Sequence, residues 1–386
     1  MQSTRRFGLG AAALAVNFLL LPGLAVAQTW SAPEFVTNGN GVALATNGKG
    51  TSALLFWETG PGLMGTVGIN GVWSSPVLLS AATSVGEVAV APNGDVLAVW
   101  SFHTNNTTTP IETQAAFYSG GRWGNTITIT GSGSASASSS VGNVAAIGFD
   151  GTSEATIVWE QLLSSTSCGL EAVTGNSSSG FGTPQVLGNT CLGTVGLAVN
   201  NNGEALAVQG GATLEVAPVL GTLRGANGVW GASFDIATPY YGRQRPHVAL
   251  GNNGTAVVTW RARTFSEYAI LENGKWSAPA ELPGSSSADS TVAVDGGGNA
   301  VAAYSGKVSS RVPGGTFQSP IILGSGQVVA SQAGTFMVNG NSVATRLPGS
   351  TTWNQNGPTS GIVSIGPGQA VVGTPPATSV STASVP

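Results

Sequence analysis

An arginine-rich stretch is the part of the sequence whose side chains are best suited to hold a ligand. It contains two tyrosines, four arginines and a histidine, namely Tyr240, Tyr241, Arg243, Arg245, His247, Arg261 and Arg263. The planar guanidinium fork of arginine suits carboxylate, sulfate and phosphate groups, and a tyrosine ring offers an apolar surface to a sugar ring. The stretch predicts a site for an anionic ligand, for instance an acidic glycan. The alternative is a set of ion pairs that only holds loops together.

Two glutamates could form a pair of catalytic carboxylates. Glu58 and Glu160 each follow a tryptophan at the end of an apolar run. His103 lies two residues after the corresponding Ser101 and is a further candidate for ligand binding, together with the arginine-rich stretch. A glycosidase needs two such carboxylates around the scissile bond. The alternative is that each glutamate ends a strand in solvent or pairs with Arg261.

Other catalytic signatures are mostly absent from the sequence. There is no nucleophile elbow, and His103 and His247 are the only histidines, so no set of residues has metal-ligand spacing. We therefore expect no metal and no other cofactor, and we favour binding over catalysis.

A repeat of the sequence must position these residues. Eight aromatic residues recur along the chain, at Trp30, Trp73, Trp123, Phe181, Trp230, Trp276, Phe317 and Trp353. Their mean spacing of about 46 residues is that of four-stranded propeller blades. Each interval holds a run of Val, Ala and Gly, an Asn/Gly turn, a second apolar run that often ends in an aromatic residue, and a third run before another tight turn. Such short runs without helical periodicity indicate an all-β fold.

Two features assign the strands, which we call a, b, c and d. A proline follows five of the eight aromatic residues by three positions, and proline marks an edge strand because it cannot donate to a ladder. The Val/Ala/Gly run suits an innermost strand packed around an axis. We predict a β-propeller of four-stranded blades, with eight blades, or seven as the alternative, closed by the N-terminal strand. A pair of β-sandwiches is the other fold considered.

The loops and cysteines suggest where binding occurs. The b–c and d–a connections, which would share one face, vary in sequence and length, as at 101–111, 131–142, 160–167, 238–246, 262–267 and 283–289. We call this the long-loop face and expect ligand binding there. The opposite, short-turn face carries the a–b and c–d turns. Cys168 and Cys191 would lie at the long-loop end of one blade, and we predict a disulfide between them rather than two buried thiols.

The ends of the chain differ from its middle. Residues 1–27 combine Arg5 and Arg6, an apolar run and Ala25-Val26-Ala27, which together predict a signal peptide rather than a membrane anchor. We therefore expect an exported protein, periplasmic or extracellular, without stable membrane insertion after cleavage. Residues 28–373 form the predicted propeller. Residues 374–386 form a Pro/Ser/Thr-rich tail that is either a weak third strand or disordered.

The composition excludes several functions. Charged residues make up 8% of the chain and the net charge is −4, whereas a typical soluble domain is roughly 25% charged. The net charge of the chain is negative, and the sequence has no dense cluster of Lys and Arg of the kind that binds phosphate backbones. We therefore do not expect nucleic acid as a partner. The 41% of hydrophobic residues permits a sizeable core.

The repeated Trp-Ser-x-Pro strands at 30–33, 73–76 and 276–279, together with the blade order, resemble secreted bacterial propellers of the sialidase-like and lectin-like kind. The resemblance covers the mature chain and is architectural. The sialidase motif Ser-x-Asp-x-Gly-x-x-Trp is not found, and the arginines do not match a sialidase triad one by one, so no catalytic residue is carried over. The resemblance implies an exported propeller that binds carbohydrate or a cell-surface partner. A glycoside hydrolase or lyase acting on extracellular glycans, and a protein-interaction scaffold, are the alternatives.

Overall fold

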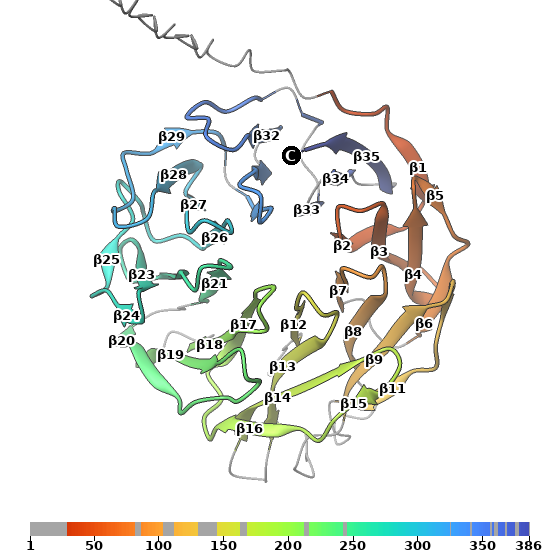
Figure 1. Cartoon of the computed structure of the whole chain (residues 1–386), viewed down its shortest axis with the longest axis horizontal. Coiled ribbons are helices and arrows are strands. Elements are labelled where there is room, and N and C mark those ends of the chain that lie inside the picture. The colour runs from red at the N-terminus through yellow and green to blue at the C-terminus, as the bar shows by residue number, and fades with distance from the viewer. Residues whose placement is uncertain are drawn as a thin grey trace, which may run out of the picture.

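The computed structural model describes residues 29–81, 86–102, 112–129, 145–162, 168–211, 216–241, 245–324, 326–339, 342–355, 357–358, 362–366, 369–374 and 378–385. Its 35 strands form eight antiparallel sheets arranged as a ring around a central axis (Figure 1). The described residues contain no helix. The fold is therefore an all-β propeller with eight blades, which confirms the prediction from the eight aromatic positions.

The first four blades follow one plan from centre to rim, and strand d is split into two pieces in three of them. Their strands are, in blade 1, β2 (Asn40–Thr46), β3 (Thr51–Glu58), β4 (Gly62–Ile69) and β5 (Val72–Trp73) with β6 (Val77–Ser80); in blade 2, β7 (Gly86–Val90), β8 (Val96–Phe102), β9 (Glu112–Ser119) and β10 (Arg122–Trp123) with β11 (Ile127–Ile129); in blade 3, β12 (Ala146–Phe149), β13 (Ala155–Leu162), β14 (Cys168–Asn176) and β15 (Gly180–Phe181) with β16 (Gln185–Gly188); and in blade 4, β17 (Gly193–Val199), β18 (Ala205–Gly211), β19 (Val216–Arg224) and β20 (Phe234–Tyr241).

The last four blades repeat the plan with shorter strands. Their strands are, in blade 5, β21 (His247–Leu250), β22 (Ala256–Arg261), β23 (Ser266–Glu272) and β24 (Lys275–Trp276) with β25 (Ala280–Glu281); in blade 6, β26 (Ser290–Val294), β27 (Ala300–Tyr304), β28 (Lys307–Arg311) and β29 (Ile321–Ile322); in blade 7, β30 (Val328–Ala330), β31 (Phe336–Asn339) and β32 (Val343–Arg346); and in blade 8, β33 (Ile362–Gly366), β34 (Gln369–Thr374), β35 (Thr378–Ser384) and β1 (Glu34–Thr37). In blade 7, a single bridge from Asn354 to Thr345 takes the place of strand d.

The N-terminal strand closes the ring. Strand β1 pairs antiparallel with β35, and Trp30 forms a further bridge to Ala383. Strand β1 is thus the outermost strand of a sheet whose other three strands come from the C-terminal part of the chain (Figure 1). Strand β35 also shows that the segment from 374 onward holds the third strand of blade 8, so the propeller extends to Ser384.

Neighbouring blades meet through their a–b turns at the short-turn end of this axis. The backbone N–H of Gly151 donates to the carbonyl of Asn201 in the next blade at 3.1 Å, and Gly296 donates to Gln332 at 3.0 Å. A Cβ atom at Gly366 would lie only 2.5 Å from the carbonyl carbon of Asn47, across the junction that closes the ring. The turns touch backbone to backbone, which requires glycine at these positions.

Tryptophans of strand b pack between blades. Trp100, Trp159 and Trp260 on strand b are almost completely buried. The indole N–H of Trp100 donates to Gln114 Oε1 at 3.0 Å, so the polar edge of the ring is satisfied inside the core.

Cys168 and Cys191 form the predicted disulfide, with their Cα atoms 5.6 Å apart. Cys168 begins β14 and Cys191 follows β16, so the bond ties the start of strand c to the connection into blade 4. Within the described ranges, the chain also lacks any helix long and apolar enough to cross a membrane. Both findings are compatible with an exported protein.

We predict that Gly366→Ala weakens ring closure. The added methyl group would meet the backbone of the blade 1 turn, and overpacking of this kind costs roughly 1–3 kcal/mol. The free energy of unfolding, measured in urea, should fall by that amount. Gly188→Ala is the matched control, because a Cβ atom there has no neighbour within 4 Å. Equal stability of the two variants would contradict the tight contact.

We predict that replacing both cysteines by serine lowers the free energy of unfolding by roughly 3 kcal/mol. The bond joins residues 23 positions apart, and the chain-entropy model gives about this value for such a loop. Urea denaturation of the purified variant measures the loss. Two alkylatable thiols in the wild-type protein under non-reducing conditions would show that the bond does not form.

Candidate functional site

A cavity of about 500 Å³ lies inside the ring, lined by the inner strands of blades 2 to 5 and by Gln327 beside β30. Strand a begins at the long-loop face, and the polar lining residues stand at strand beginnings. Glu87 is the second residue of β7, Thr194 the second of β17, and His247 the first of β21. The cavity is therefore the long-loop mouth of the central channel.

Glu87 is the carboxylate of this cavity. Side chains alternate along a strand, so Gly86 faces Leu55 and Leu63 of blade 1, whereas Glu87 points away from them into the channel. The side chain is exposed to the channel, yet protein surrounds it on most sides. The resulting loss of bulk solvation raises its pKa to about 7.

His247 stands in the same cavity wall. Burial lowers the pKa of its imidazole, the Arg245 guanidinium lowers it further, and the Asp289 carboxylate opposes the shift. The imidazole is therefore neutral at neutral pH and offers one donor and one acceptor. The sequence analysis assigned His247 to a ligand site, and the structure places it in the wall of this cavity.

The predicted arginines lie on the long-loop face beside the cavity. Arg245 lines the cavity and pairs with Asp289, with Nη1 and Oδ2 at 2.9 Å. Arg261, the last residue of β22, donates from Nε to Ser287 Oγ at 3.0 Å. The 287–289 segment thus contacts both arginines and brings the two stretches of sequence together.

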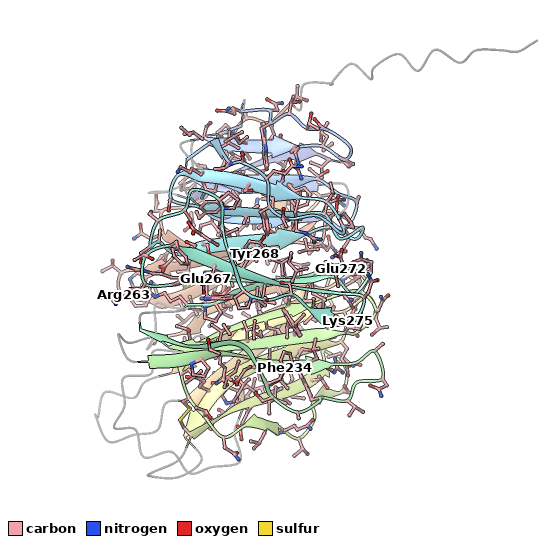
Figure 2. The ribbon with its side chains drawn as sticks, turned by 90° about the vertical axis from the view of Figure 1, so that its left-hand side faces the viewer. Phe234, Arg263, Glu267, Tyr268, Glu272 and Lys275 are labelled. Carbon is pink, nitrogen blue, oxygen red and sulfur yellow. A yellow bond between two sulfur atoms is a disulfide. The ribbon has the colours of Figure 1, made fainter. Side chains whose placement is uncertain are left out.

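Arg263 completes the described arginines of this face. It is exposed, and Figure 2 shows it at the edge of the molecule opposite to Glu272 and Lys275, which lie towards the short-turn face. Tyr240 and Tyr241 end strand β20, where their backbones pair with Ala217 and Val216. Arg243 and His103 lie outside the described residues.

Glu58 and Glu160 accept hydrogen bonds that join neighbouring segments of the propeller. The Thr37 hydroxyl donates to Glu58 Oε1 at 3.2 Å, which ties blade 1 to the closing strand. The backbone N–H groups of Leu192 and Gly193 donate to Glu160 Oε1 at 2.8 and 3.0 Å. Both glutamates have structural bonds, and those of Glu160 fix the start of β17. Among the residues that the structure describes, no group of three or more His, Cys, Asp or Glu side chains could hold a metal ion.

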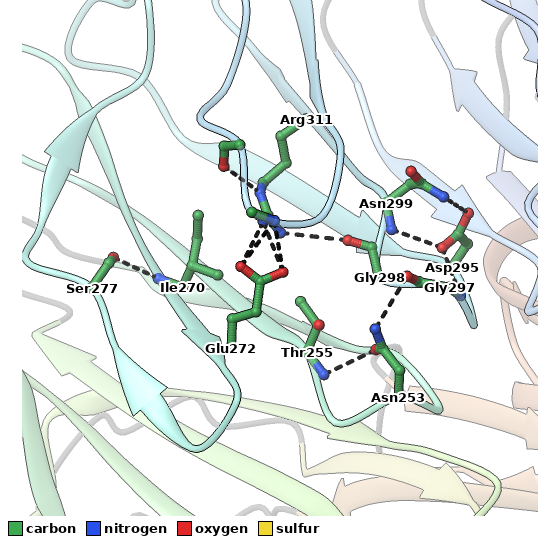
Figure 3. Close-up of polar contacts among 12 residues, drawn as sticks. Asn253, Thr255, Ile270, Glu272, Ser277, Asp295, Gly297, Gly298, Asn299 and Arg311 are labelled. Atoms are coloured by element: carbon green, nitrogen blue, oxygen red, sulfur yellow. Dashed lines mark hydrogen bonds and ion pairs between the residues drawn. The ribbon is translucent and has the colours of Figure 1, made fainter.

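Two further arginines, which the sequence reasoning did not single out, are buried at the short-turn face. Arg311 at the end of β28 binds both oxygens of Glu272 at 3.2 Å, and its Nε donates to the carbonyl of Gly315 at 3.0 Å (Figure 3). Arg224 ends strand c of blade 4 and pairs with Glu154 of blade 3 at 3.1 Å. Both residues end strand c and join adjacent blades, and this shared position is the signal that could have identified them.

Glu267 is a second carboxylate with a raised pKa. It is the second residue of strand c of blade 5, where its Oε2 accepts the indole N–H of Trp260 at 2.8 Å and its backbone pairs with Glu281. Burial raises the pKa of Glu267, the bond from Trp260 lowers it, and the charge of Glu281 raises it. The equivalent acceptor in blade 2 is an uncharged amide, that of Gln114.

Comparison with known proteins identifies the fold. No family model and no curated protein matches the chain. Among solved structures, the Dos1 propeller has a TM-score of 0.58 at 8% identity, over 92% of this chain and 95% of that chain. A polysaccharide lyase of family PL25, an ulvan lyase, has a TM-score of 0.49 at 10% identity, over 83% of this chain and 93% of that one. The microbial sialidase Hz136 has a TM-score of 0.38 at 10% identity, over 73% of this chain and 70% of the sialidase chain. The likeness to the Dos1 propeller establishes the propeller fold alone.

We predict that Glu267→Gln stabilises the protein at pH 8 more than at pH 5. Gln still accepts the Trp260 N–H, as Gln114 does for Trp100, and it removes the repulsion from Glu281. The pKa of Glu267 is higher in the folded protein than in the unfolded chain. Its contribution to stability is therefore present at low pH and is lost as the pH rises through the pKa of the folded protein. Relief of the like-charge cross-strand pair is worth roughly 0.2–1 kcal/mol. Urea denaturation at both pH values measures the difference, and a gain confined to pH 5 would contradict the raised pKa.

Proposed function

We propose that this propeller is an exported binding protein that holds an anionic ligand, such as an acidic glycan, on its long-loop face. The observation that carries the proposal is the convergence of Arg245 and Arg261 on the 287–289 segment, at the rim of a cavity of about 500 Å³. A cavity of this size is in the range of ligand pockets. The disulfide supports export, because such bonds persist in oxidising compartments.

The charges of this face support an anionic ligand. Arg245 forms an ion pair with Asp289. Among the described residues, Arg261 donates to the Ser287 hydroxyl and pairs with no carboxylate, and the exposed Arg263 forms no ion pair. These two guanidinium groups therefore retain uncompensated positive charge in a chain whose net charge is −4. Their fork-shaped donors match carboxylate and sulfate groups.

The two glutamates that could have formed a hydrolytic pair support binding over hydrolysis. Glu160 accepts backbone N–H groups and the Gln209 amide at 3.0 Å, and Glu58 accepts the Thr37 hydroxyl. The carboxylate oxygens of both glutamates are thus hydrogen-bonded to neighbouring segments of the chain. We therefore assign the face to recognition.

An array of acidic and neutral oligosaccharides, probed with the protein from residue 28 onward, tests the proposal. We expect retention of acidic glycans and weaker retention as salt is added, because salt screens exposed charges. Arg245→Ala and Arg263→Ala should each weaken binding roughly tenfold, the effect of losing a charge-assisted hydrogen bond. Their unfolding free energies should change by only about 0–1 kcal/mol.

Arg122→Ala is the matched control, because Arg122 is exposed in β10 beside a c–d turn of the opposite face. This variant should bind as the wild type does. The proposal is overturned if no acidic glycan is retained, or if the arginine variants bind normally and melt at much lower temperature. The second result would make the arginines structural.

A further inference from the structure

The channel cavity holds three polar side chains whose hydrogen-bonding groups are not used within the described part of the chain. Glu87, His247 and Gln327 line the cavity, and none of their side chains makes a hydrogen bond or ion pair to a described residue. They come from blades 2, 5 and 7, so their convergence depends on the closed ring. The wall between them is mixed and includes the apolar residues Ala146 and Leu197.

Other acidic side chains near the channel are satisfied by the protein. Asp150 Oδ1 accepts the backbone N–H groups of Thr152 and Glu154 at 2.8 and 2.9 Å. Asp295 Oδ1 accepts those of Gly297 and Asn299 in the same way, at 2.9 and 2.8 Å. Glu87 accepts no such donor from a described residue, and the surrounding protein restricts its contact with bulk water, which raises its pKa to about 7. Glu87 is therefore placed for a partner from outside the chain.

We infer that the channel cavity is a subsite for an uncharged, hydroxyl-rich group, such as a neutral sugar residue, held by Glu87, His247 and Gln327. A carboxyl, a neutral imidazole and an amide together offer both donors and acceptors. Sugar hydroxyls can satisfy both kinds at once, and apolar lining residues such as Leu197 can pack against the C–H face of a ring.

The same groups disfavour a charged ligand inside the cavity. An anion would meet the Glu87 carboxyl and would exchange bulk water for a partly apolar wall. A cation would meet Arg245, the charged residue that stands between the cavity and the outer face. Burial also favours the neutral form of Glu87, which weakens its attraction for a cation.

This inference rests on the proposed function for the rest of the ligand. Arg245 touches both the cavity and Asp289 on the face, so a ligand could place an anionic group on the arginines and a neutral residue in the channel. Salt dependence then separates the two subsites, because screening weakens the arginine contacts and leaves the hydrogen bonds of the cavity nearly unchanged.

Titration of the protein with neutral monosaccharides tests the cavity. The probes are glucose, galactose, mannose, rhamnose, fucose and N-acetylglucosamine, with glucuronate and galacturonate as charged counterparts, and calorimetry or ligand-observed NMR measures binding. We expect at least one neutral sugar to bind wild-type protein with little salt dependence. Glu87→Leu should weaken that binding about tenfold, the effect of removing one hydrogen-bonding partner from a buried site. Glu87→Gln keeps hydrogen-bonding groups of the same size and should stay within about threefold.

Arg122→Ala, on the opposite face, is the control that should leave monosaccharide binding unchanged, and thermal melting confirms that each variant is folded. The inference is overturned if no neutral sugar binds, or if Glu87→Leu binds the sugar as well as wild type does. Loss of acidic-glycan binding in the arginine variants alone would support the proposed function and reject the cavity subsite. Loss of sugar binding in Glu87→Leu alone would support the subsite and reject the role of the arginines.

Discussion

The close approach of eight inner strands and their turns to one axis is the constraint on which the rest of this structure depends. At that radius the neighbouring a–b turns touch through their backbones, as Gly151 does with Asn201 and Gly366 with Asn47. Small residues such as Gly, Ala and Val leave the most room at this radius, which explains why they predominate in strand a. Larger side chains, such as Trp100 and Trp260, occupy strand b, where the wedge between adjacent blades is wider.

The same constraint makes the two ends of the channel different. At the short-turn end, the turns interlock through repeated hydrogen bonds, and a cavity of about 360 Å³ is lined by residues of the turns themselves, among them Asn47, Ser331 and Gln332. At the long-loop end, the strands begin after connections of varied length, and side chains such as Glu87 and His247 enter the channel. The repeat therefore fixes one face and leaves the other free to vary, which is where binding groups are expected.

Much of the fold could be predicted from the sequence because its signals repeat at a fixed spacing. Proline in strand d marks the rim, Val/Ala/Gly runs mark the axis, and an unpaired strand at each end of the repeat implies closure. The disulfide was predictable because Cys168 and Cys191 fall at the same end of one blade. The cavity was not, since Glu87 and His247 are 160 positions apart and meet only because the ring closes. One acidic residue in an otherwise apolar inner strand was the available signal.

The arginines show why residue type alone does not locate a site. The sequence distinguishes them only by position, whereas the structure distinguishes them by partner. Arg311 and Arg224 are buried at the short-turn face and are joined to carboxylates of the preceding blade, so their charge is used in joining blades. Arg261 and Arg263 meet no carboxylate among the described residues. Burying a guanidinium group is costly unless it is paired, but an exposed one keeps its hydration and remains available. In a chain that is only 8% charged, Arg224 and Arg311 thus join blades, whereas Arg261 and Arg263 on the long-loop face keep guanidinium groups that pair with no described carboxylate.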